Sequence, residues 1–357
     1  MGESARWIFC LGQMKAGTTW FYESSIRCPE VFTPPVKELR ILSTFARHGI
    51  LTLQEKMSSE SFESVREFMD DRRNTFLEYP RVFIKQFADL YGAVGQKLLT
   101  KVSVDQFQWW LQYLAAPWTP QLFEQLSSGL TCKYVLDASP ENVIVPHAVL
   151  TMLAKEIQRP KLVLLLRCPL RRILSHLWMF HEWRPVLASG SEDAIRALLA
   201  SSKEQERLQT AVKHTCVLEG ISRWRKIFGD ESIFIIVLDE MQEYGAPIQE
   251  ALEEFLEVDS FPLLEAKINR SREASFSKAW REKLAPTAAS VREKLKLELH
   301  IDLPDEEEST VRISRSDMQS GRLDVRNPVP VRVLDVETVS RRICREWLDQ
   351  LSIPIAL

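Results

Sequence analysis

Three short segments of the chain are apolar at nearly every position, not at every second one. They are RWIFCLG at 6–12, KLVLLLR at 161–167 and SIFIIVL at 232–238, and KYVLDA at 133–138 is a shorter fourth. A strand that is apolar throughout suits a parallel sheet, because helices then cover both of its faces and bury both sets of alternating side chains. We predict that these four segments are central parallel strands.

Segments with the spacing of amphipathic helices lie between these strands. The spacing predicts helices over 62–72, 107–116, 170–183, 211–228 and 247–257, the last with Pro247 in its first turn. Strands that alternate with helices are typical of α/β proteins. We therefore predict an α/β fold of three layers, with a central parallel sheet and helices on both faces, in a single domain spanning 1–357.

The last part of the chain has a different composition. From about 285 to 335 it is dense in charge and then turn-like, which predicts a charged insertion, a linker or a flap over the site. A final helix is predicted over 336–351. Its apolar face is made by residues four apart: Val339, Ile343, Trp347 and Leu351.

Composition and charge narrow the function. The net charge of −3 and the pI of about 6.2 give no overall basic field, which argues against nucleic acid as a partner. No segment approaches the roughly 20 apolar residues of a membrane span, so we expect a soluble, cytoplasmic protein. The six cysteines are scattered and the six histidines form no ligand pattern, so no metal site is predicted.

The segment CLGQMKAGTTWF at 10–21 joins the first predicted strand to a helix. A Walker loop places its Lys after the second Gly of G-x-x-x-x-G-K-[ST], whereas here Lys15 precedes Gly17 and two threonines follow. A strand, a glycine turn and a helix still direct backbone N–H groups, the helix dipole and hydroxyls at an anion. The sequence thus predicts a P-loop-like phosphate site that is not the ATPase version.

The order K-A-G-T-T-W directly after a strand resembles the 5′-phosphosulfate loop of sulfotransferases that use 3′-phosphoadenosine 5′-phosphosulfate (PAPS), whose signature is close to P-K-x-G-T-T-W. The resemblance implies that PAPS is bound by Lys15, Ala16, Gly17, Thr18, Thr19 and Trp20. In that family's arrangement Lys15 would neutralise the bridging oxygen as adenosine 3′,5′-bisphosphate leaves, the two threonines and the Gly17 amide would hold the 5′-phosphate, and Trp20 would stack on adenine.

A second matching element follows the strand at 161–166. In RCPLRRILSHLWMF, Arg167 stands at the strand end and Ser175 eight positions later. In the family, an Arg and a Ser in these places hold the 3′-phosphate of the donor. A guanidinium offers a planar, permanently charged fork, and a hydroxyl two helical turns on can reach the same group.

Two further segments resemble the heparan-sulfate-type and bacterial branch more than the cytosolic phenol and steroid branch, whose K-T-H segment and His base have no counterpart here. KELRILSTF at 37–45 is similar to K-E-x-H-F-F, which implies Glu38 as catalytic base, with Arg40 in place of the usual His. YVLDASPENV at 134–143 is similar to E-K-S-P-S-Y, but Asp137 replaces the Glu and a substrate-side Lys is missing. Asp137 and His48 are alternative bases.

The resemblance covers about 6–260, and two later basic segments, 269–275 and 320–326, are open candidates for a last donor-binding loop. It implies transfer of a sulfuryl group from PAPS, without a metal, to a hydroxyl or amine of a small-molecule acceptor. Two alternatives stay open. One is an ATP-dependent P-loop kinase with Asp137 or Asp239 on Mg²⁺, and the other is an inactive nucleotide-fold binding protein. The oligomeric state is not predicted.

Overall fold

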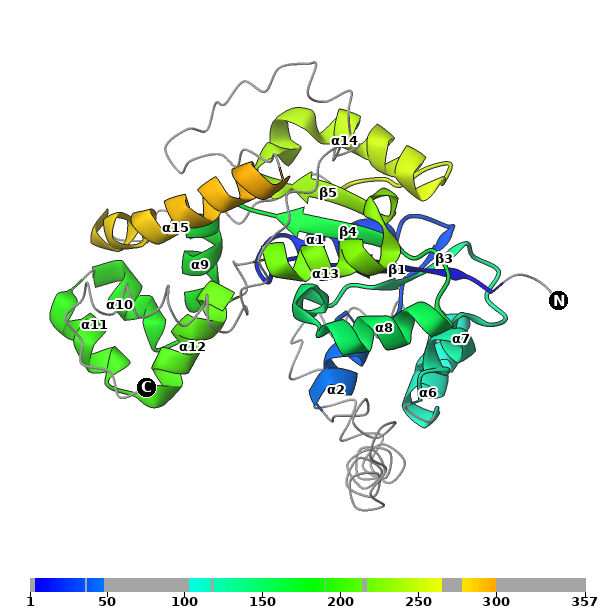
Figure 1. Ribbon diagram of the computed structural model, residues 1–357, viewed down its shortest axis with the longest axis horizontal. Coiled ribbons are helices and arrows are strands. Elements are labelled where there is room, and N and C mark those ends of the chain that lie inside the picture. Colours follow the sequence, from blue (N-terminus) through cyan, green and yellow to red (C-terminus); the bar gives the residue numbers. More distant parts are fainter. Residues whose placement is uncertain are drawn as a thin grey trace.

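A five-stranded, parallel β-sheet forms the centre of the protein (Figure 1). The computed structural model describes residues 4–35, 37–47, 103–116, 119–189, 191–213, 217–264 and 278–299. The strand order is β2-β3-β1-β4-β5. The strands are β1 (Arg6–Cys10), β2 (Val31–Phe32), β3 (Tyr134–Asp137), β4 (Lys161–Leu166) and β5 (Ile233–Val237). The four predicted strands are thus confirmed, and β2 is an additional one.

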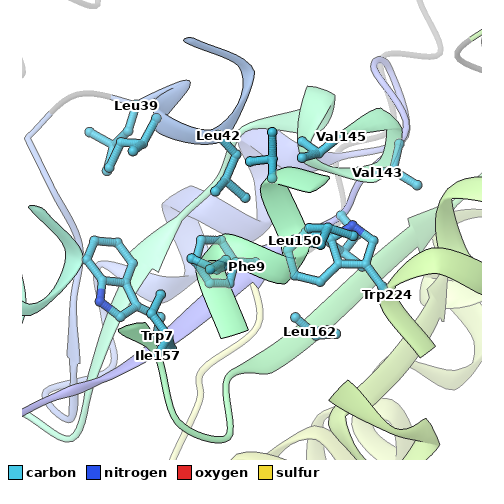
Figure 2. Packing of buried hydrophobic residues seen from close by; sticks show 14 of the residues in the cluster. Trp7, Phe9, Leu39, Leu42, Val143, Val145, Leu150, Ile157, Leu162 and Trp224 are labelled. Atoms are coloured by element: carbon cyan, nitrogen blue, oxygen red, sulfur yellow. The ribbon is translucent and has the colours of Figure 1, made fainter. Parts of the chain in front are cut away.

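The central strand β1 shows why the strands are apolar throughout. It pairs in parallel with β3 on one side and β4 on the other, with Ile8 opposite both Leu136 and Lys161. Trp7 and Phe9 point into one hydrophobic core and Ile8 into another, and all three are at most 2% exposed. Figure 2 shows Trp7 and Phe9 within the first core. Both faces of the sheet are therefore buried, as the sequence predicted.

Helices cover both faces, which confirms the three-layer α/β architecture. One face is covered by α2 (Ile41–Arg47), α6 (Val104–Ala115), α7 (Leu122–Ser127), α8 (His147–Glu156) and α13 (Leu218–Phe228). The other face is covered by α1 (Thr18–Ser25) and α14 (Met241–Leu256). Figure 1 shows α14 and α8 on opposite sides of the strands. Single-turn helices are η1 (Pro140–Ile144), η2 (Asp230–Ser232) and η3 (Leu238–Glu240).

A group of helices beside the sheet encloses a third hydrophobic cluster (Figure 1, left). Its members are α9 (Pro169–Leu177), α10 (Trp183–Ser189), α11 (Glu192–Leu199), α12 (Ser202–Lys213) and α15 (Lys278–Leu299). The first part of the predicted 285–335 insertion is thus the second half of α15, which packs against α9. The rest of that segment and the predicted helix 336–351 lie outside the described residues. No helix in the described ranges is long and apolar enough to cross a membrane.

Three helix predictions need correction, and a fourth lies outside the described residues. The predicted helix 170–183 is two helices, because α9 ends at Leu177 and α10 begins at Trp183. The predicted helix 211–228 is also divided, since α12 ends at Lys213 and α13 begins at Leu218. Pro247 is not in a first turn but inside α14, which begins six residues earlier. The segment 62–72 is not among the described residues.

The sheet topology points to one edge as the place for a ligand. From β1 the chain moves to β2 and returns through β3 on the same side, and it then crosses to β4 on the other side. The direction of winding therefore reverses beside β1. In open parallel sheets, ligands bind outside the carboxyl ends of the strands at such a switch point. The loop after β1 and the residues after β4 meet at this edge.

Candidate active site

The loop between β1 and α1 has the backbone of an anion-binding turn. Its first part stays paired with β4, because the Leu11 N–H donates to the Val163 carbonyl at 2.7 Å and the Gln13 N–H to the Leu165 carbonyl at 3.2 Å. Lys15 and Gly17 then take left-handed conformations with φ of 72° and 97°. Such turns group backbone N–H donors on a concave side, and Gly17 also caps α1, whose first N–H groups have no partner within the helix.

Glycine is required at both ends of this loop. A Cβ on Gly12 would lie 2.2 Å from Cγ2 of Thr18. Gly17 has a left-handed backbone, and a Cβ on it would lie 2.8 Å from Cδ1 of Leu238. Thr18 is accordingly buried against Gly12, whereas Thr19 is exposed. Of the two predicted hydroxyl ligands, Thr19 is the one that faces solvent. The predicted contact residue Ala16 is fully buried, and its N–H donates to the Gln13 carbonyl at 3.0 Å, so the structure does not present it to a ligand.

Two buried arginines from the β4–α9 segment hold the carbonyl groups of the loop. Nη1 of Arg167 donates to the Lys15 carbonyl at 3.2 Å, and Nη1 of Arg172 donates to the Met14 carbonyl at 3.1 Å. Nη2 of Arg172 also donates to the carbonyl of Ala211 in α12. The structure thus brings two predicted site residues, Lys15 and Arg167, together. It also adds Arg172, which the sequence analysis missed.

The sequence pattern does not single out Arg172. At 3.6 residues per turn it lies on the side of α9 opposite the apolar residues Leu170, Ile173 and Leu177, where a charged side chain is normally exposed. In the structure it is fully buried, and its bonds to two carbonyl groups supply the polar partners that a buried charge needs. Ser175, in contrast, is half-buried near the end of α9, eight positions after Arg167 in the sequence.

Asp239, a candidate Mg²⁺ ligand of the kinase alternative, is bonded to residues at the start of α9. Its Oδ2 accepts the N–H of Cys168, the N-cap of α9, at 2.7 Å, and its Oδ1 lies 3.3 Å from Nη1 of Arg171. The side chain is only 4% exposed. Both carboxylate oxygens are therefore used to cap the helix and fix the arginine.

The turn at 37–40 holds Glu38 between two cations. Oε1 of Glu38 lies 2.5 Å from Nζ of Lys37, and Oε2 lies 2.9 Å from Nη2 of Arg40. Burial raises the pKa of Glu38, but the Lys37 and Arg40 charges and hydrogen bonds outweigh it and hold the pKa below its usual value. The side chain is 27% exposed. Glu38 is therefore an ionised carboxylate that solvent can reach.

This turn is strained and fixed from several sides. Glu38 and Arg40 have φ of 64° and 57°, a left-handed conformation that is costly for residues other than glycine. The hydroxyl of Tyr113 in α6 donates to the Leu39 carbonyl at 2.8 Å, and the Leu39 side chain is buried in the first core near Leu42 (Figure 2). Long-range contacts thus hold a backbone that the local sequence disfavours.

The chain leading into the turn lies beside α1 and the end of β1. Tyr22 in α1 donates its hydroxyl to the Pro34 carbonyl at 2.6 Å, and Gln106 in α6 donates to the Thr33 carbonyl at 2.9 Å. Burial raises the pKa of Cys10, the last residue of β1, to about 12, and the positive charge of Lys37 acts against this rise. Because β2 and β1 both run parallel to β3, the segment after β2, which contains Lys37 and Glu38, leaves the sheet at the same edge as the loop after β1.

Asp137, the alternative base, is enclosed at the end of β3. It is fully buried and accepts a hydrogen bond of 2.5 Å from Oγ of Ser139. Burial raises its pKa to about 6, although the bonds from Ser139 oppose the shift. Asp137 cannot meet an acceptor without rearrangement. His48, the other alternative, lies outside the described residues.

Trp20 is anchored by its nitrogen. Its indole Nε1 donates to the Leu264 carbonyl at 2.7 Å, and the ring packs partly against the second core. The ring is half-buried, so its orientation is set by the protein. Stacking on adenine stays a prediction. The described ranges hold no group of three or more His, Cys, Asp or Glu side chains that could bind a metal ion.

The chain matches no protein-family model and no curated protein at a significant level. Similar solved structures include a sulfotransferase from Alicyclobacillus acidocaldarius, with 16% identity, a TM-score of 0.48, and coverage of 85% of this chain and 98% of that chain. The sulfotransferase domain of the Synechococcus PCC 7002 olefin synthase is 13% identical, with a TM-score of 0.38 and coverage of 99% and 96%. The sulfotransferase domain from the curacin biosynthetic pathway is 16% identical, with a TM-score of 0.38 and coverage of 99% of both chains. Because all three TM-scores lie below 0.5, a shared function has to rest on the residues of the site.

Proposed function

We propose that this protein is a sulfotransferase that moves a sulfuryl group from PAPS to a hydroxyl or amine of a small molecule. The observation that carries the proposal is the loop at the switch point of the sheet. It combines left-handed Lys15 and Gly17, the start of α1, and the Arg167 guanidinium on the Lys15 carbonyl. We assign the loop amides to one anionic group and the Arg167 guanidinium to a second, because a 3′,5′-substituted nucleotide presents two.

The residues of the site fit such a donor. The loop amides and the exposed Thr19 hydroxyl are suited to the 5′-phosphate, because they are hydrogen-bond donors at a helix N-terminus. Arg167 and Ser175 are suited to the 3′-phosphate, and the anchored ring of Trp20 to the adenine. The remaining predicted contact is the N–H of Gly17, whereas Ala16 is fully buried and its N–H is bonded to the Gln13 carbonyl.

The chemistry assigned to the chain's own residues is charge balance and proton transfer. PAPS supplies an activated sulfuryl group when it is bound. Lys15 balances negative charge on the departing oxygen, and Glu38, an ionised carboxylate open to solvent, accepts the proton of the acceptor. Lys37 and Arg40 keep Glu38 ionised and in one orientation. These residues thus contribute positioning, charge stabilisation and one proton transfer.

The kinase alternative is less well supported by the same site. It needs a carboxylate at a strand end that is turned toward Mg²⁺ and the phosphates. The Asp239 side chain is only 4% exposed and is bonded at the start of α9, and Asp137 is fully buried behind Ser139. In the loop, Lys15 also precedes the glycine that it follows in a Walker motif.

Calorimetry with nucleotides tests the proposal and separates the alternatives. We expect adenosine 3′,5′-bisphosphate to bind without Mg²⁺, and more tightly than ATP. Tighter binding of ATP that depends on Mg²⁺ would instead support a kinase. Binding of the bisphosphate without any turnover of PAPS would support an inactive nucleotide-binding protein. Turnover of PAPS with a panel of phenols, alcohols, amines and sugars then identifies the acceptor class.

A further inference from the structure

The turn that carries Glu38 is connected to a buried carboxylate by one hydroxyl group. Oγ of Ser139 donates its hydrogen to Oδ1 of Asp137 at 2.5 Å and accepts the backbone N–H of Arg40 at 2.9 Å. Ser139 is fully buried and follows β3, 99 residues along the chain from Arg40. A hydroxyl has one hydrogen, so its donation to Asp137 leaves only lone pairs for the Arg40 amide.

We propose that Asp137 and Ser139 are positioning residues that hold Glu38 at the active edge of the sheet through the backbone of Arg40. This inference rests on the function proposed above. Asp137, fixed at the end of β3, sets the direction of the Ser139 hydroxyl. Ser139 in turn fixes the amide of Arg40, and the guanidinium of Arg40 holds Oε2 of Glu38 at 2.9 Å.

The strain in the turn explains why such a support is needed. Glu38 and Arg40 each pay for a left-handed backbone, at a cost on the order of 1 kcal/mol or more per residue. Without a buried acceptor for the Arg40 amide, an ordinary extended backbone would be favoured at this position. Glu38 would then lose its contact with Arg40. The catalytic carboxylate therefore depends on a hydrogen bond made on another strand.

The charges around this connection are all part of one network. Glu38 forms ion pairs with Lys37 and Arg40. Nε of Arg40 also lies 3.8 Å from Oε2 of Glu141. Asp137 is affected by the negative charge of Glu38, which raises its pKa further. A substitution of Ser139 should therefore change the pKa of Glu38, and not only lower the stability of the protein.

The test compares Ser139→Ala with Ser43→Ala. Ser43 is the matched control because its hydroxyl donates to the carbonyl of the same residue, Arg40, at 3.1 Å from the α2 side and does not contact Asp137. For Ser139→Ala we expect faster hydrogen exchange at the Arg40 amide, and a kcat about tenfold lower with unchanged affinity for adenosine 3′,5′-bisphosphate. The acidic limb of the pH–rate profile should move to higher pH, because Arg40 no longer lowers the pKa of Glu38. Ser43→Ala should leave all three close to the wild type.

The variant Ser139→Thr keeps the hydroxyl and should restore exchange protection and most of the rate. If Ser139→Ala does not fold, Asp137→Asn replaces it, with a smaller loss expected because an amide oxygen can still accept the hydroxyl. Unchanged protection of the Arg40 amide would overturn the connection. Lost protection with an unchanged kcat and pH profile would overturn its positioning role. Hydrogen exchange needs no substrate, so a protein that turns over no PAPS refutes the proposed function while the connection is still tested.

Discussion

The phosphate loop and the Glu38 turn both place charged residues in left-handed conformations at the same sheet edge, but they are stabilised differently. In the loop, Lys15 stands between two glycines that allow the close approaches of the backbone. In the turn, Glu38 and Arg40 have no glycine beside them, and buried groups far along the chain supply the support. The loop thus combines local glycines with two remote arginines, Arg167 and Arg172, whereas the turn has no glycine and depends on remote groups alone.

This difference predicts which substitutions impair the function of each region. A substitution in the loop should act directly on ligand binding and charge balance, whereas the turn should fail when its remote supports are removed. The largest effects are expected where a side chain takes part in the reaction, and smaller ones where it holds the backbone. The substitutions below separate these roles.

The largest effect is expected for Glu38→Gln. The amide keeps the shape of the side chain but removes its basicity, and a general base typically contributes about 10²- to 10⁴-fold. We expect kcat to fall by that order, with PAPS affinity nearly unchanged. The pH–rate profile should also lose its acidic limb, which in the wild type lies below the usual range of a glutamate because the pKa is lowered. If the rate and the limb survive, Glu38 is not the base.

The next largest fall in kcat is expected for Lys15→Ala. Removal of a cation that balances charge on the leaving oxygen costs on the order of 3 kcal/mol, or about a hundredfold in kcat. We expect the variant to fold, because Arg167 and Arg172 still bond the Lys15 and Met14 carbonyl groups of the loop. A folded variant with unchanged kcat would show that the loop does not act in the chemistry. Single-turnover measurement with PAPS makes the comparison.

Much of this architecture is visible in the sequence, and the exceptions have physical causes. The continuous apolar runs locate β1, β3, β4 and β5, because a buried parallel strand leaves that mark. The two-residue β2 is too short to show any period. Pro247 was expected in a first turn, but it is tolerated inside α14, where packing of Leu252 and Leu256 outweighs the missing N–H.

The candidate site also has parts that can be predicted from the sequence and parts that cannot. The phosphate loop and Arg167 are recognisable because they are contiguous or follow a strand directly. The supports of the Glu38 turn are not, since Tyr113 and Ser139 are 74 and 99 residues away from the groups they bind. The environment of Asp137 was also inaccessible to sequence, because its burial depends on η1 and the helices that pack over it.

The free energy of unfolding should depend on pH through Asp137, which supports the Glu38 turn. Its pKa in the folded protein, about 6, lies above the 3.8 of an ordinary aspartate, so the folded state binds the proton more tightly. Its contribution to stability is therefore present below about pH 4 and is lost as the pH rises to 6. This loss amounts to roughly 2–3 kcal/mol. Relative to the wild type, Asp137→Asn should gain stability over this range.

Urea unfolding of both proteins at pH 4, 5, 6 and 7 measures this difference. Asp230→Asn is a suitable control, because Asp230 is an exposed carboxylate paired with Arg225. It should show little relative change over the same range. Parallel stability curves for Asp137→Asn and the wild type would mean that Asp137 has an ordinary pKa in the folded protein.

A smaller effect is expected for Tyr113→Phe. This change removes the hydrogen bond to the Leu39 carbonyl but keeps the ring that packs against Trp109 and Trp110. Loss of one such bond costs about 1 kcal/mol. We expect a lower free energy of unfolding and a modest fall in kcat, with unchanged binding of adenosine 3′,5′-bisphosphate. Weaker nucleotide binding would contradict the separation between the turn and the loop.

The most direct test of the account is the selectivity of Arg167 for the 3′-phosphate. Calorimetry would compare adenosine 3′,5′-bisphosphate and 5′-AMP as ligands of the wild type, Arg167→Ala, and the remote control Arg225→Ala. Loss of a charged hydrogen bond costs about 2 kcal/mol, so Arg167→Ala should weaken the bisphosphate roughly 30-fold and 5′-AMP far less, while Arg225→Ala changes neither. Equal losses for the two ligands in Arg167→Ala would contradict the assignment of Arg167 to the 3′-phosphate and would leave it only the support of the Lys15 carbonyl.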